Sequence, residues 1–530
     1  MKTFPFVLRS WNVKSYESVD PTDSFGHATR VFINKNRVVK IEPQFSNDKY
    51  SSWLTDKGRL FFDGVFGKDH SNEQFQKKNS INTPEQWANL FTSISNVFYV
   101  SNICNFKHAN RYFFVIAFEN VGLETLHFMA IISRLNAFIK IRRVDKAAIN
   151  SDLETEYQLN SCTSQDRLSS SSLGLIVNLN PRYEGSYFNL MLRQRYLKGN
   201  FKLFLLGSFV DLTFPVIFLG ANVSYLKSVA EGNAVFCRDL ASAKNPFYVT
   251  NALSSKCGNG KELLNTLKVL KYSNLLTEVW DGSNVLNSSL AETGLYSSFR
   301  FVSLQFKDLL FFSAIYIVNT NFNKISNIRV LLESRILRHR FLNHSFNSTL
   351  LINQNYVPTP FTSFKFSVFK KYLYLPNSTF FENQESFINT EGCRKVCSKL
   401  VIRKNSKNDW QLLRKFVQNF QANLSFNSIK DWKVIFYDTS SFFDFKNFIH
   451  FHYQVSQNLS HLNEFAINRN AKFLVYQKTS VFKKMSVKVF NAKLKYWLDN
   501  FYTGGKDIFC FNSLTLIHCS TNYKVLSDTF

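Results

Sequence analysis

The clearest pattern of apolar and polar positions lies between residues 174 and 207. A short apolar run, residues 175–177, has the length of a buried parallel strand. After a polar loop, apolar residues recur near helical spacing until Gly199 and Asn200 end the segment. A second apolar run, residues 201–206, ends at Gly207. The pattern predicts one βαβ unit with a right-handed crossover.

The predicted helix of this unit is amphipathic. Its apolar face carries Phe188, Met191, Leu192 and Tyr196. Its other side carries Arg193, Arg195 and Lys198.

The loop between the first strand and the helix is the main candidate site, because open parallel sheets bind ligands at the carboxyl ends of their strands. Its candidate residues are Asn178, Asn180, Pro181, Arg182 and Glu184. The loop has no glycine before Gly185, so its backbone cannot approach a pyrophosphate as closely as a Gly-rich loop does. For Glu184 we favour an interaction with the helix dipole, worth roughly a few tenths of a kcal/mol, over a catalytic role.

The rest of the chain predicts a mixture of strands and helices. Residues 29–33 and 38–41 flank a polar turn and predict a β-hairpin. Thr83, Pro84 and Gln86 form a capping pattern that predicts a helix from about residue 83. Further patterns predict a strand at 112–118, a helix at 124–135, a strand at 137–141 and an amphipathic helix at 410–420.

An internal repeat supports a two-part α/β build. The strand-and-loop sequence at residues 176–180 returns at 317–321, and the helical pattern at 191–197 returns at 331–337. These patterns predict an α/β fold with doubly wound, Rossmann-like halves. We expect a small β-rich N-terminal domain at 1–70, two pseudo-repeated α/β halves at 71–365, and a C-terminal α/β segment and tail at 366–530.

Composition changes this picture little. Phe occurs 57 times and, like the abundant Asn, Lys and Ile, has AT-rich codons, so we infer an AT-rich gene such as an organelle's. The net charge is +26, which is typical of proteins that bind nucleic acid or an anionic membrane. Basic residues form no run of five and are not confined to one segment, so we favour solvated basic faces.

The chain lacks the motifs of common catalytic and metal sites. A Gly-rich phosphate loop, HExxH, GxSxG and paired CxxC are all missing. The scattered spacing of the eight cysteines favours free thiols. Only Cys393 and Cys397 lie close together, and their spacing is a weak metal signal. His450 and His452 have no third ligand nearby in the sequence. We therefore predict no catalytic residue and no metal ligand in this chain.

The best membrane candidate, residues 201–223, is long enough to span a bilayer. Asp211 at its centre costs about 2.5–3.5 kcal/mol on insertion scales, and Gly207 and Pro215 interrupt the run. We expect a strand, a loop and a second short segment, with no direct membrane span.

Several short blocks follow one another in a recognisable order. They are residues 9–64, Asn-Pro-Arg-Tyr-Glu at 180–184, 207–212, Asn-Thr-Glu-Gly at 389–392 with 409–410, 437–439, 455–459, and 501–503 with Cys519. Together they resemble the molybdopterin-oxidoreductase-like portion of the large iron–sulfur subunit of respiratory complex I (NADH:ubiquinone oxidoreductase). The resemblance implies the multi-domain architecture of that family.

The departures from the family shape what the resemblance implies. No cysteine precedes Cys104, whereas the family's full-length subunit begins with cysteine-rich domains that hold iron–sulfur clusters. The resemblance therefore implies a split subunit, whose cluster-bearing N-terminal part is a separate chain. It implies no cofactor on this chain, with iron–sulfur clusters and FMN on partner subunits. The loop at residues 178–184 would be the relic of a cofactor loop, filled by protein side chains.

The resemblance implies an accessory, non-catalytic subunit of the hydrophilic arm of mitochondrial complex I. Its partners would be the cluster-bearing chain and other hydrophilic-arm subunits, with no nucleic acid, on the matrix side of the inner membrane. The Met1 start without a presequence favours mitochondrial encoding. Two alternatives stay open: an active molybdopterin-dependent oxidoreductase, and a basic nucleic-acid-binding protein whose binding would depend steeply on salt.

Overall fold

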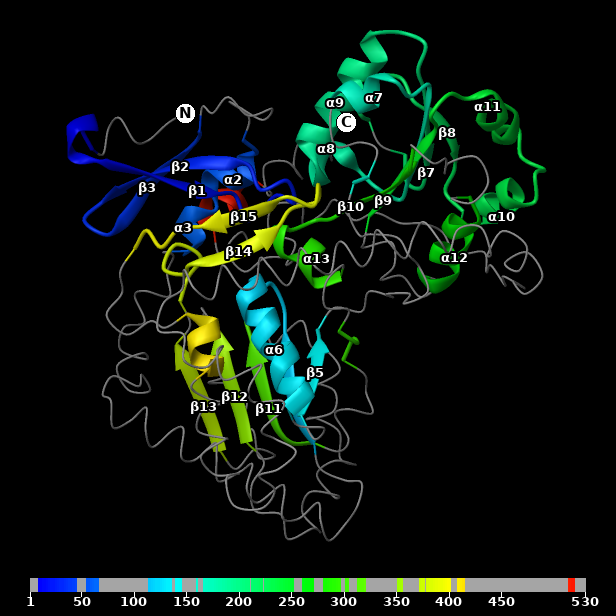
Figure 1. Cartoon of the computed structure of the whole chain (residues 1–530). Coiled ribbons are helices and arrows are strands. Elements are labelled where there is room, and N and C mark those ends of the chain that lie inside the picture. Colours follow the sequence, from blue (N-terminus) through cyan, green and yellow to red (C-terminus); the bar gives the residue numbers. More distant parts are fainter. Residues whose placement is uncertain are drawn as a thin grey trace, which may run out of the picture.

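The fold was analysed in a computed structural model of the chain. The structure describes residues 8–44, 54–65, 113–135, 139–144, 159–160, 165–209, 211–222, 224–251, 260–270, 280–296, 301–304, 312–320, 350–355, 371–376, 378–401, 408–414 and 513–519. The helix predicted from residue 83 and the two histidines at 450 and 452 lie outside the described residues. Figure 1 shows how the described elements are arranged.

The N-terminal part forms a three-stranded antiparallel sheet. Its strands are β1 (Lys14–Val19), β2 (Ala28–Asn34) and β3 (Arg37–Pro43), after a short 3₁₀ turn, η1 (Ser10–Asn12). Lys35 and Asn36 both have positive φ, 43° and 68°, which is the geometry of a two-residue hairpin turn. The predicted hairpin is confirmed. The short helices α2 (Asp56–Leu60) and α3 (Phe62–Val65) follow, and a core of Val31, Ile41, Phe61 and their neighbours joins them to the sheet.

The first large sheet is parallel, with strand order β10-β9-β6-β7-β8. Its strands are β6 (Leu173–Val177), β7 (Lys202–Leu206), β8 (Ile217–Gly220), β9 (Phe247–Asn251) and β10 (Ser283–Leu286). Every residue of β6 is buried, because it is the central strand and helices cover both faces. The expected strand, loop and second short segment at residues 201–223 are β7, its following loop and β8.

Helices lie on both faces of this sheet (Figure 1). One face carries α7 (Gln165–Ser169), α8 (Pro181–Glu184) and α9 (Ser186–Leu197). The other carries α10 (Ser224–Ala230), α11 (Phe236–Ser242) and α12 (Gly260–Leu270). Alternate strand residues supply the two cores: Ile176 packs in the cluster that includes Phe188 of α9, whereas Val177 packs with Leu226 of α10.

The predicted βαβ unit is confirmed as β6, α8, α9 and the parallel strand β7. The prediction that Arg195 lies on the polar side of the helix is wrong, because this residue is buried. Arg195 is 9% exposed and donates hydrogen bonds to the carbonyls of Ser171 (2.9 and 2.6 Å) and Gly199 (2.7 Å). Ser171 lies before β6 and Gly199 lies after the helix, and the long guanidinium reaches both carbonyls while it stacks over Phe201 (5.2 Å).

The second large sheet is also parallel, with strand order β13-β12-β11-β4-β5. Its strands are β4 (Phe113–Phe118), β5 (Ile139–Arg143), β11 (Phe312–Val318), β12 (Leu350–Asn355) and β13 (Lys371–Pro376). The helix α6 (Leu123–Leu135) connects β4 and β5 and lies across the sheet (Figure 1). The strands predicted at 112–118 and 137–141, and the helix between them, are confirmed. The whole first sheet is inserted in the chain between β5 and β11.

The internal repeat coincides with the central strands of the two sheets. β6 is followed by Asn178 with φ of 50°, and β11 is followed by Asn319 with φ of 51°. Asparagine tolerates this left-handed conformation better than most residues. The strand and the asparagine turn therefore recur, whereas the second copy of the helix, residues 331–337, lies outside the described residues. The proposed domain boundaries stay a prediction.

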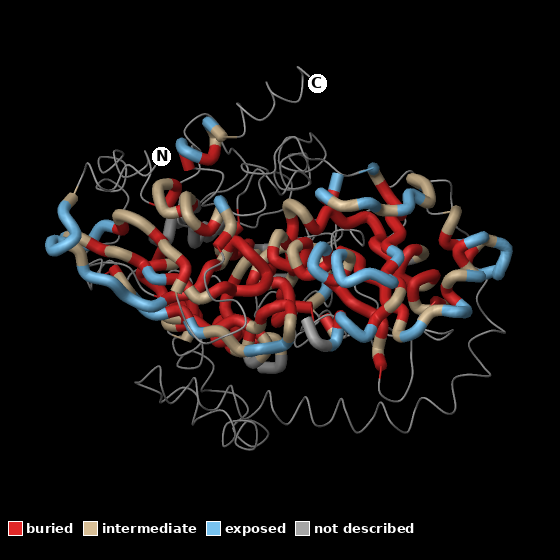
Figure 2. The backbone as a smooth tube through the Cα atoms, turned by 90° about the horizontal axis from the view of Figure 1, so that it is seen from above, coloured by how far each residue is buried: buried red, intermediate tan, exposed pale blue. Residues whose placement is uncertain are grey.

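A two-stranded hairpin lies between the three sheets (Figure 1). Its strands are β14 (Glu385–Ile388) and β15 (Arg394–Cys397), and the nearby helix α13 (Leu290–Gly294) begins with a capping box at Ser289. Seen from above, buried backbone runs through the middle of the molecule and exposed backbone lies at its edges (Figure 2). Among the described residues, no helix is both long and apolar enough to cross a membrane.

Candidate functional site

The loop after β6 leaves the sheet at Asn178, whose N–H donates to the carbonyl of Leu206 (2.7 Å). Gly207 lies against it, and a Cβ there would come within 3.1 Å of the Asn178 Cα. Gly207 also has φ of 143°, which side chains rarely allow. Gly207, which follows β7, therefore permits the close approach to the backbone of Asn178. The loop after β6 itself has no glycine before Gly185.

Glu184 ties the loop to the neighbouring strand. It is the last residue of α8 and is 9% exposed. Its carboxylate accepts hydrogen bonds from the backbone N–H of Asn180 (3.2 Å) and from the side-chain amide of Asn251 at the end of β9 (2.6 Å). This contact gives Glu184 a positioning role that the sequence did not indicate.

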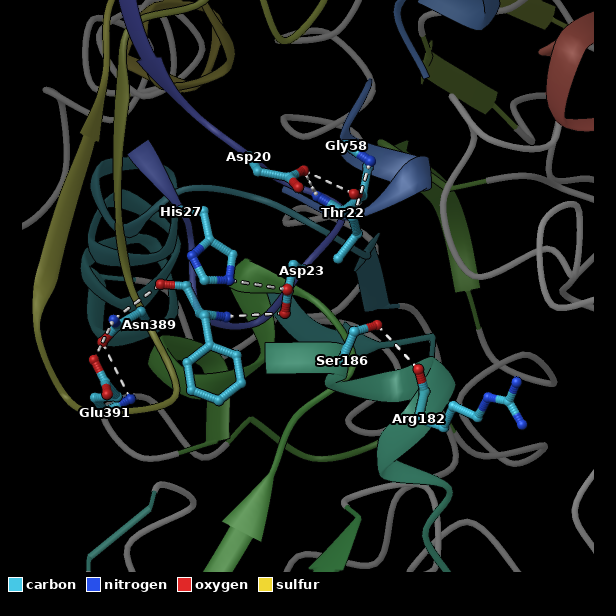
Figure 3. Close-up of polar contacts among 11 residues, drawn as sticks. Asp20, Thr22, Asp23, His27, Gly58, Arg182, Ser186, Asn389 and Glu391 are labelled. Carbon is cyan, nitrogen blue, oxygen red and sulfur yellow. Dashed lines mark hydrogen bonds and ion pairs between the residues drawn. The ribbon is translucent and has the colours of Figure 1, made fainter. Parts of the chain in front are cut away.

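The side chain of Arg182 points away from His27 and Asp23, as Figure 3 shows. Its guanidinium pairs with the carboxylate of Asp211 (3.0 Å), and the two side chains are 39% and 73% exposed. An ion pair this exposed contributes at most about 1 kcal/mol to stability. Its carbonyl accepts a hydrogen bond from Ser186 Oγ (3.0 Å), which links α8 to α9.

The five predicted loop residues lie together, but they do not fit a phosphate-bearing cofactor. The N–H of Asn180 already binds Glu184, and Pro181 has no N–H to offer. The Glu184 carboxylate would repel a phosphate, and the nearest guanidinium, on Arg182, is engaged with Asp211. Anion sites at helix starts depend on free N–H groups, and neither Asn180 nor Pro181 supplies one here.

Three distant parts of the chain meet at one place, which we call the junction. It consists of the loop at residues 20–27 after β1, residues 182–187 at the start of α9, and the turn at 389–391 after β14. Each part lies in or beside a sequence block that carries the family resemblance. Figure 3 shows the 20–27 loop between the turn and the start of α9.

The 389–391 turn is joined to the 20–27 loop by hydrogen bonds. The side-chain amide of Asn389 donates to the carbonyl of Phe25 (3.0 Å), and the N–H of Thr390 donates to the carbonyl of Ser24 (2.8 Å). The Oδ1 of Asn389 accepts from the N–H of Cys393 (2.7 Å), which fixes the turn itself. Asn389 and Thr390 are fully buried, so the loss of either contact would leave buried polar groups unpaired.

Aromatic rings and one imidazole–carboxylate contact fill the centre of the junction. His27 and Asp23 are 1% and 4% exposed and pair at 3.4 Å. Tyr187 of α9 meets the rings of Phe25 and His27 edge-on, at centroid distances of 5.6 and 5.4 Å. Such contacts add about 0.5–1.5 kcal/mol each beyond the burial of their area. Burial, with a smaller contribution from the carboxylate of Glu391, raises the pKa of Tyr187.

Asp20 is the most perturbed carboxyl group of the junction. Its Oδ1 accepts hydrogen bonds from the N–H (2.9 Å) and hydroxyl (2.7 Å) of Thr22. Burial, and next the carboxylate of Asp23, raises its pKa to about 6, against the lowering effect of Thr22 and His27. Gly58 of α2 packs directly against this carboxylate, where a larger residue would collide with it.

A second set of buried carboxyl groups lies beside the second sheet. Glu124 of α6 accepts hydrogen bonds from the N–H (2.9 Å) and hydroxyl (2.5 Å) of Ser386. Glu385 of β14 accepts hydrogen bonds from the N–H of Gly122 and the hydroxyl of Thr125, both at 3.1 Å. Burial raises the pKa of Glu124 and raises that of Glu385 further, because other carboxylates lie close to Glu385.

Cys393 and Cys397 lie in different environments. Cys393 is exposed in the turn, whereas Cys397 is buried in β15 opposite Glu385. Burial, and next the carboxylate of Glu385, raises the pKa of the Cys397 thiol well above its usual value. In the described part of the chain, no three His, Cys, Asp or Glu side chains are arranged to hold a metal ion.

Sequence reasoning missed the buried titratable groups of both places. Asp23 and His27 are four residues apart in a loop, and nothing in the sequence indicates that they are buried. Glu124 is 262 residues away from its hydrogen-bond partner Ser386, and Glu385 is 263 residues away from its partner Gly122.

The chain was compared with known protein families and with individual proteins. The model of the molybdopterin oxidoreductase family matches residues 86–419. The NADH-ubiquinone oxidoreductase 75 kDa subunit of Reclinomonas americana is 23% identical over 99% of this chain and 70% of its own length. The corresponding Acanthamoeba castellanii subunit is 22% identical over 100% of this chain and 68% of its own length. The mitochondrial 78 kDa subunit of Neurospora crassa is 27% identical over 56% of this chain and 39% of its own length.

The chain therefore belongs to the molybdopterin oxidoreductase family. Within this family it is homologous over nearly its whole length to 75 kDa subunits of NADH-ubiquinone oxidoreductase, and over 56% of its length to the 78 kDa subunit. The family resemblance and the α/β fold class predicted from the sequence are confirmed. The relatives' activity belongs to their complete assemblies and is transferred to this chain only as a proposal below.

Proposed function

We propose that this chain is an accessory, non-catalytic subunit of the hydrophilic arm of mitochondrial complex I. Its role is to support the iron–sulfur chain that carries electrons from NADH to ubiquinone. The proposal rests on homology to the large complex I subunit over nearly the whole chain. It places the chain at the inner membrane on the matrix side.

The observation that carries the non-catalytic part is the state of the loop after β6. Its two charged side chains are engaged within the protein: Glu184 accepts hydrogen bonds from the N–H of Asn180 and the side-chain amide of Asn251, and Arg182 pairs with Asp211. A cofactor loop offers such groups to its ligand instead. The buried side-chain amide of Asn180 has no hydrogen-bond partner among the described residues. In this proposal the chain keeps the architecture of the family, while Glu184 and Arg182 of the loop after β6 make contacts within the protein.

The proposal assigns no cofactor to this chain. Iron–sulfur clusters and FMN belong to its partners, which are the cluster-bearing part of the same subunit as a separate chain and other hydrophilic-arm subunits. The contribution of this chain is then the burial of an interface with the cluster-bearing part. Such an interface keeps clusters dry and in register without any redox group of its own.

Native purification tests the proposal directly. Mitochondria are solubilised in mild detergent, complex I is resolved on a native gel, and the chain is followed with an antibody before and after a wash in high salt. The expected result is that the chain migrates with complex I after the wash. Absence of the chain from the complex I band would overturn the proposal.

Metal analysis of the purified chain separates it from the main alternative, an active molybdopterin-dependent oxidoreductase. That enzyme class is favoured by the family match at residues 86–419. The accessory role predicts less than one-tenth equivalent of molybdenum and of iron per chain. Stoichiometric molybdenum would support the alternative, and iron retained by this chain alone would contradict the split-subunit proposal.

A further inference from the structure

A cavity of about 90 Å³ lies where the N-terminal sheet, the second large sheet and the β14–β15 hairpin meet. Since about 10–15 Å³ of such volume holds one water molecule, the cavity has room for a small ligand. Its polar lining residues are Thr22, Asn120, Ser289, Asn319, Ser378, Asn383 and Glu385. Its other lining residues are Pro21, Leu290, Ala291, Phe380, Phe387 and Cys397.

The charge of the lining selects the ligand. None of the lining residues is Lys, Arg or His, and Glu385 is the acidic one. No described basic side chain forms an ion pair with Glu385, which is 4% exposed. An anion would therefore enter a buried site beside a carboxyl group, whereas a cation would gain a partner there.

Glu385 is held in place for such a partner. Gly122 N–H binds one oxygen of its carboxyl group and Thr125 hydroxyl binds the other. A Cβ at position 122 would lie 2.6 Å from Glu385 Oε2, so the glycine allows this close contact. Two donors that fix a carboxyl group keep its orientation when it ionises.

Asn383 gives a second, independent indication of a hydrogen-bonding ligand. It lines the cavity and is 7% exposed, and its Oδ1 accepts no hydrogen bond from any residue that the structure describes. A buried acceptor without a donor costs about 1–3 kcal/mol. A ligand that carries N–H donors would satisfy both this amide oxygen and the carboxyl group of Glu385.

We propose that this cavity binds a small organic cation, a primary ammonium group on a compact apolar body, with Glu385 as its counter-ion. The ammonium group lies at the polar residues of the lining, and the body packs against Leu290, Phe380 and Phe387. The site is separate from the loop after β6 and independent of the assembly role.

The proposal predicts a pH dependence with a definite sign. The groups near Glu385 are Glu124 of α6, Asp409 in the helical turn at 408–414, and Cys397 of β15, while Arg394 lies 3.8 Å from Glu124. Burial and the two neighbouring carboxylates raise the pKa of Glu385 well above its usual value. Binding of a cation therefore releases a proton, and the affinity for the cation rises with pH.

Calorimetric titration of the full chain tests this with three probes of one shape: benzylamine, benzyl alcohol and benzoate. Between pH 6 and 8 we expect saturable binding of benzylamine at least tenfold tighter than benzyl alcohol, and no saturable binding of benzoate. Benzylamine binding should release a proton, measured in two buffers of different ionisation enthalpy. Equal affinity for the cation and the alcohol, or binding of benzoate, would overturn the proposal.

Variants locate the site. Glu385→Gln should weaken benzylamine binding at least tenfold and leave benzyl alcohol unchanged, whereas Ala291→Leu should weaken both by filling the cavity. Glu231→Gln removes the same charge at the exposed end of α10 and should change neither affinity. Unchanged benzylamine binding in both cavity variants would exclude this cavity. The proton release of the unaltered chain tests the counter-ion even where a variant does not fold.

Discussion

The raised pKa of Asp20 predicts that Asp20→Asn stabilises the protein at neutral pH relative to acid pH. Asp20 lies at the junction, where the loop after β1 meets Gly58 of α2. Folding raises its pKa from 3.8 to about 6 because burial and Asp23 disfavour the carboxylate. Asparagine keeps an oxygen that accepts the two hydrogen bonds from Thr22 and carries no charge.

The sign follows from proton binding. Since the folded state binds the Asp20 proton more tightly than the unfolded state, the contribution to stability is fully present below pH 3.8. It is lost as the pH rises through about 6. The whole difference corresponds to about 3 kcal/mol, of which about 2 kcal/mol falls between pH 4.5 and 7.5. Asp20 is fully buried, so solvent screening does not reduce this figure.

Urea unfolding at pH 4.5 and 7.5, at constant ionic strength, measures this effect. The free energy of unfolding of Asp20→Asn, relative to the unaltered chain, should rise by about 2 kcal/mol from the lower to the higher pH. Asp56→Asn is the matched control, because Asp56 lies exposed at the start of α2. A difference that does not change with pH, or that changes in the opposite direction, would refute the electrostatic reasoning.

Three further substitutions test the other contacts. Arg195→Ala should lower the free energy of unfolding by about 1.5–3 kcal/mol in urea titrations, because two buried hydrogen bonds to the carbonyl of Ser171 and a part-buried one to that of Gly199 are lost; an effect below about 0.5 kcal/mol would show that the guanidinium is dispensable. Gly207→Ala should cost more than Gly232→Ala in thermal unfolding, because both have positive φ but only Gly207 has a close neighbour; equal shifts would contradict the crowding. Arg182→Ala should change the free energy of unfolding by less than about 1 kcal/mol and lose even that in 1 M salt, because its pair with Asp211 is exposed; a larger, salt-independent loss would mean that Arg182 has a buried role.

Local patterns predicted the elements well where one signal dominated. The turn after β2 carries Lys35 and Asn36 between two apolar strands, and the hairpin formed as expected. The all-buried strand β6 and the Gly199 stop after α9 defined the βαβ unit. The repeated strand-asparagine pattern correctly marked the central strands of two sheets, since both Asn178 and Asn319 take up the left-handed conformation.

The roles of individual polar residues were predicted less well. Helical spacing placed Arg195 on the polar side, yet its guanidinium is buried and donates to the carbonyls of Gly199 after the helix and of Ser171 before β6. The interaction of Glu184 with the helix dipole stays a prediction, whereas its bond to Asn251, 67 residues away, could not be inferred from local sequence. Contacts across such separations leave no trace in local periodicity.

The sequence by itself determined the family, the α/β class and the loop after β6, because ordered motifs and local periodicity are properties of the chain. Only the tertiary structure decided that Asp20, His27, Tyr187 and Asn389 share one junction, and that Glu124 and Glu385 lie buried beside one cavity. The physical reason is that burial and charge neighbours set a side chain's chemistry, and both come from segments that only folding brings together.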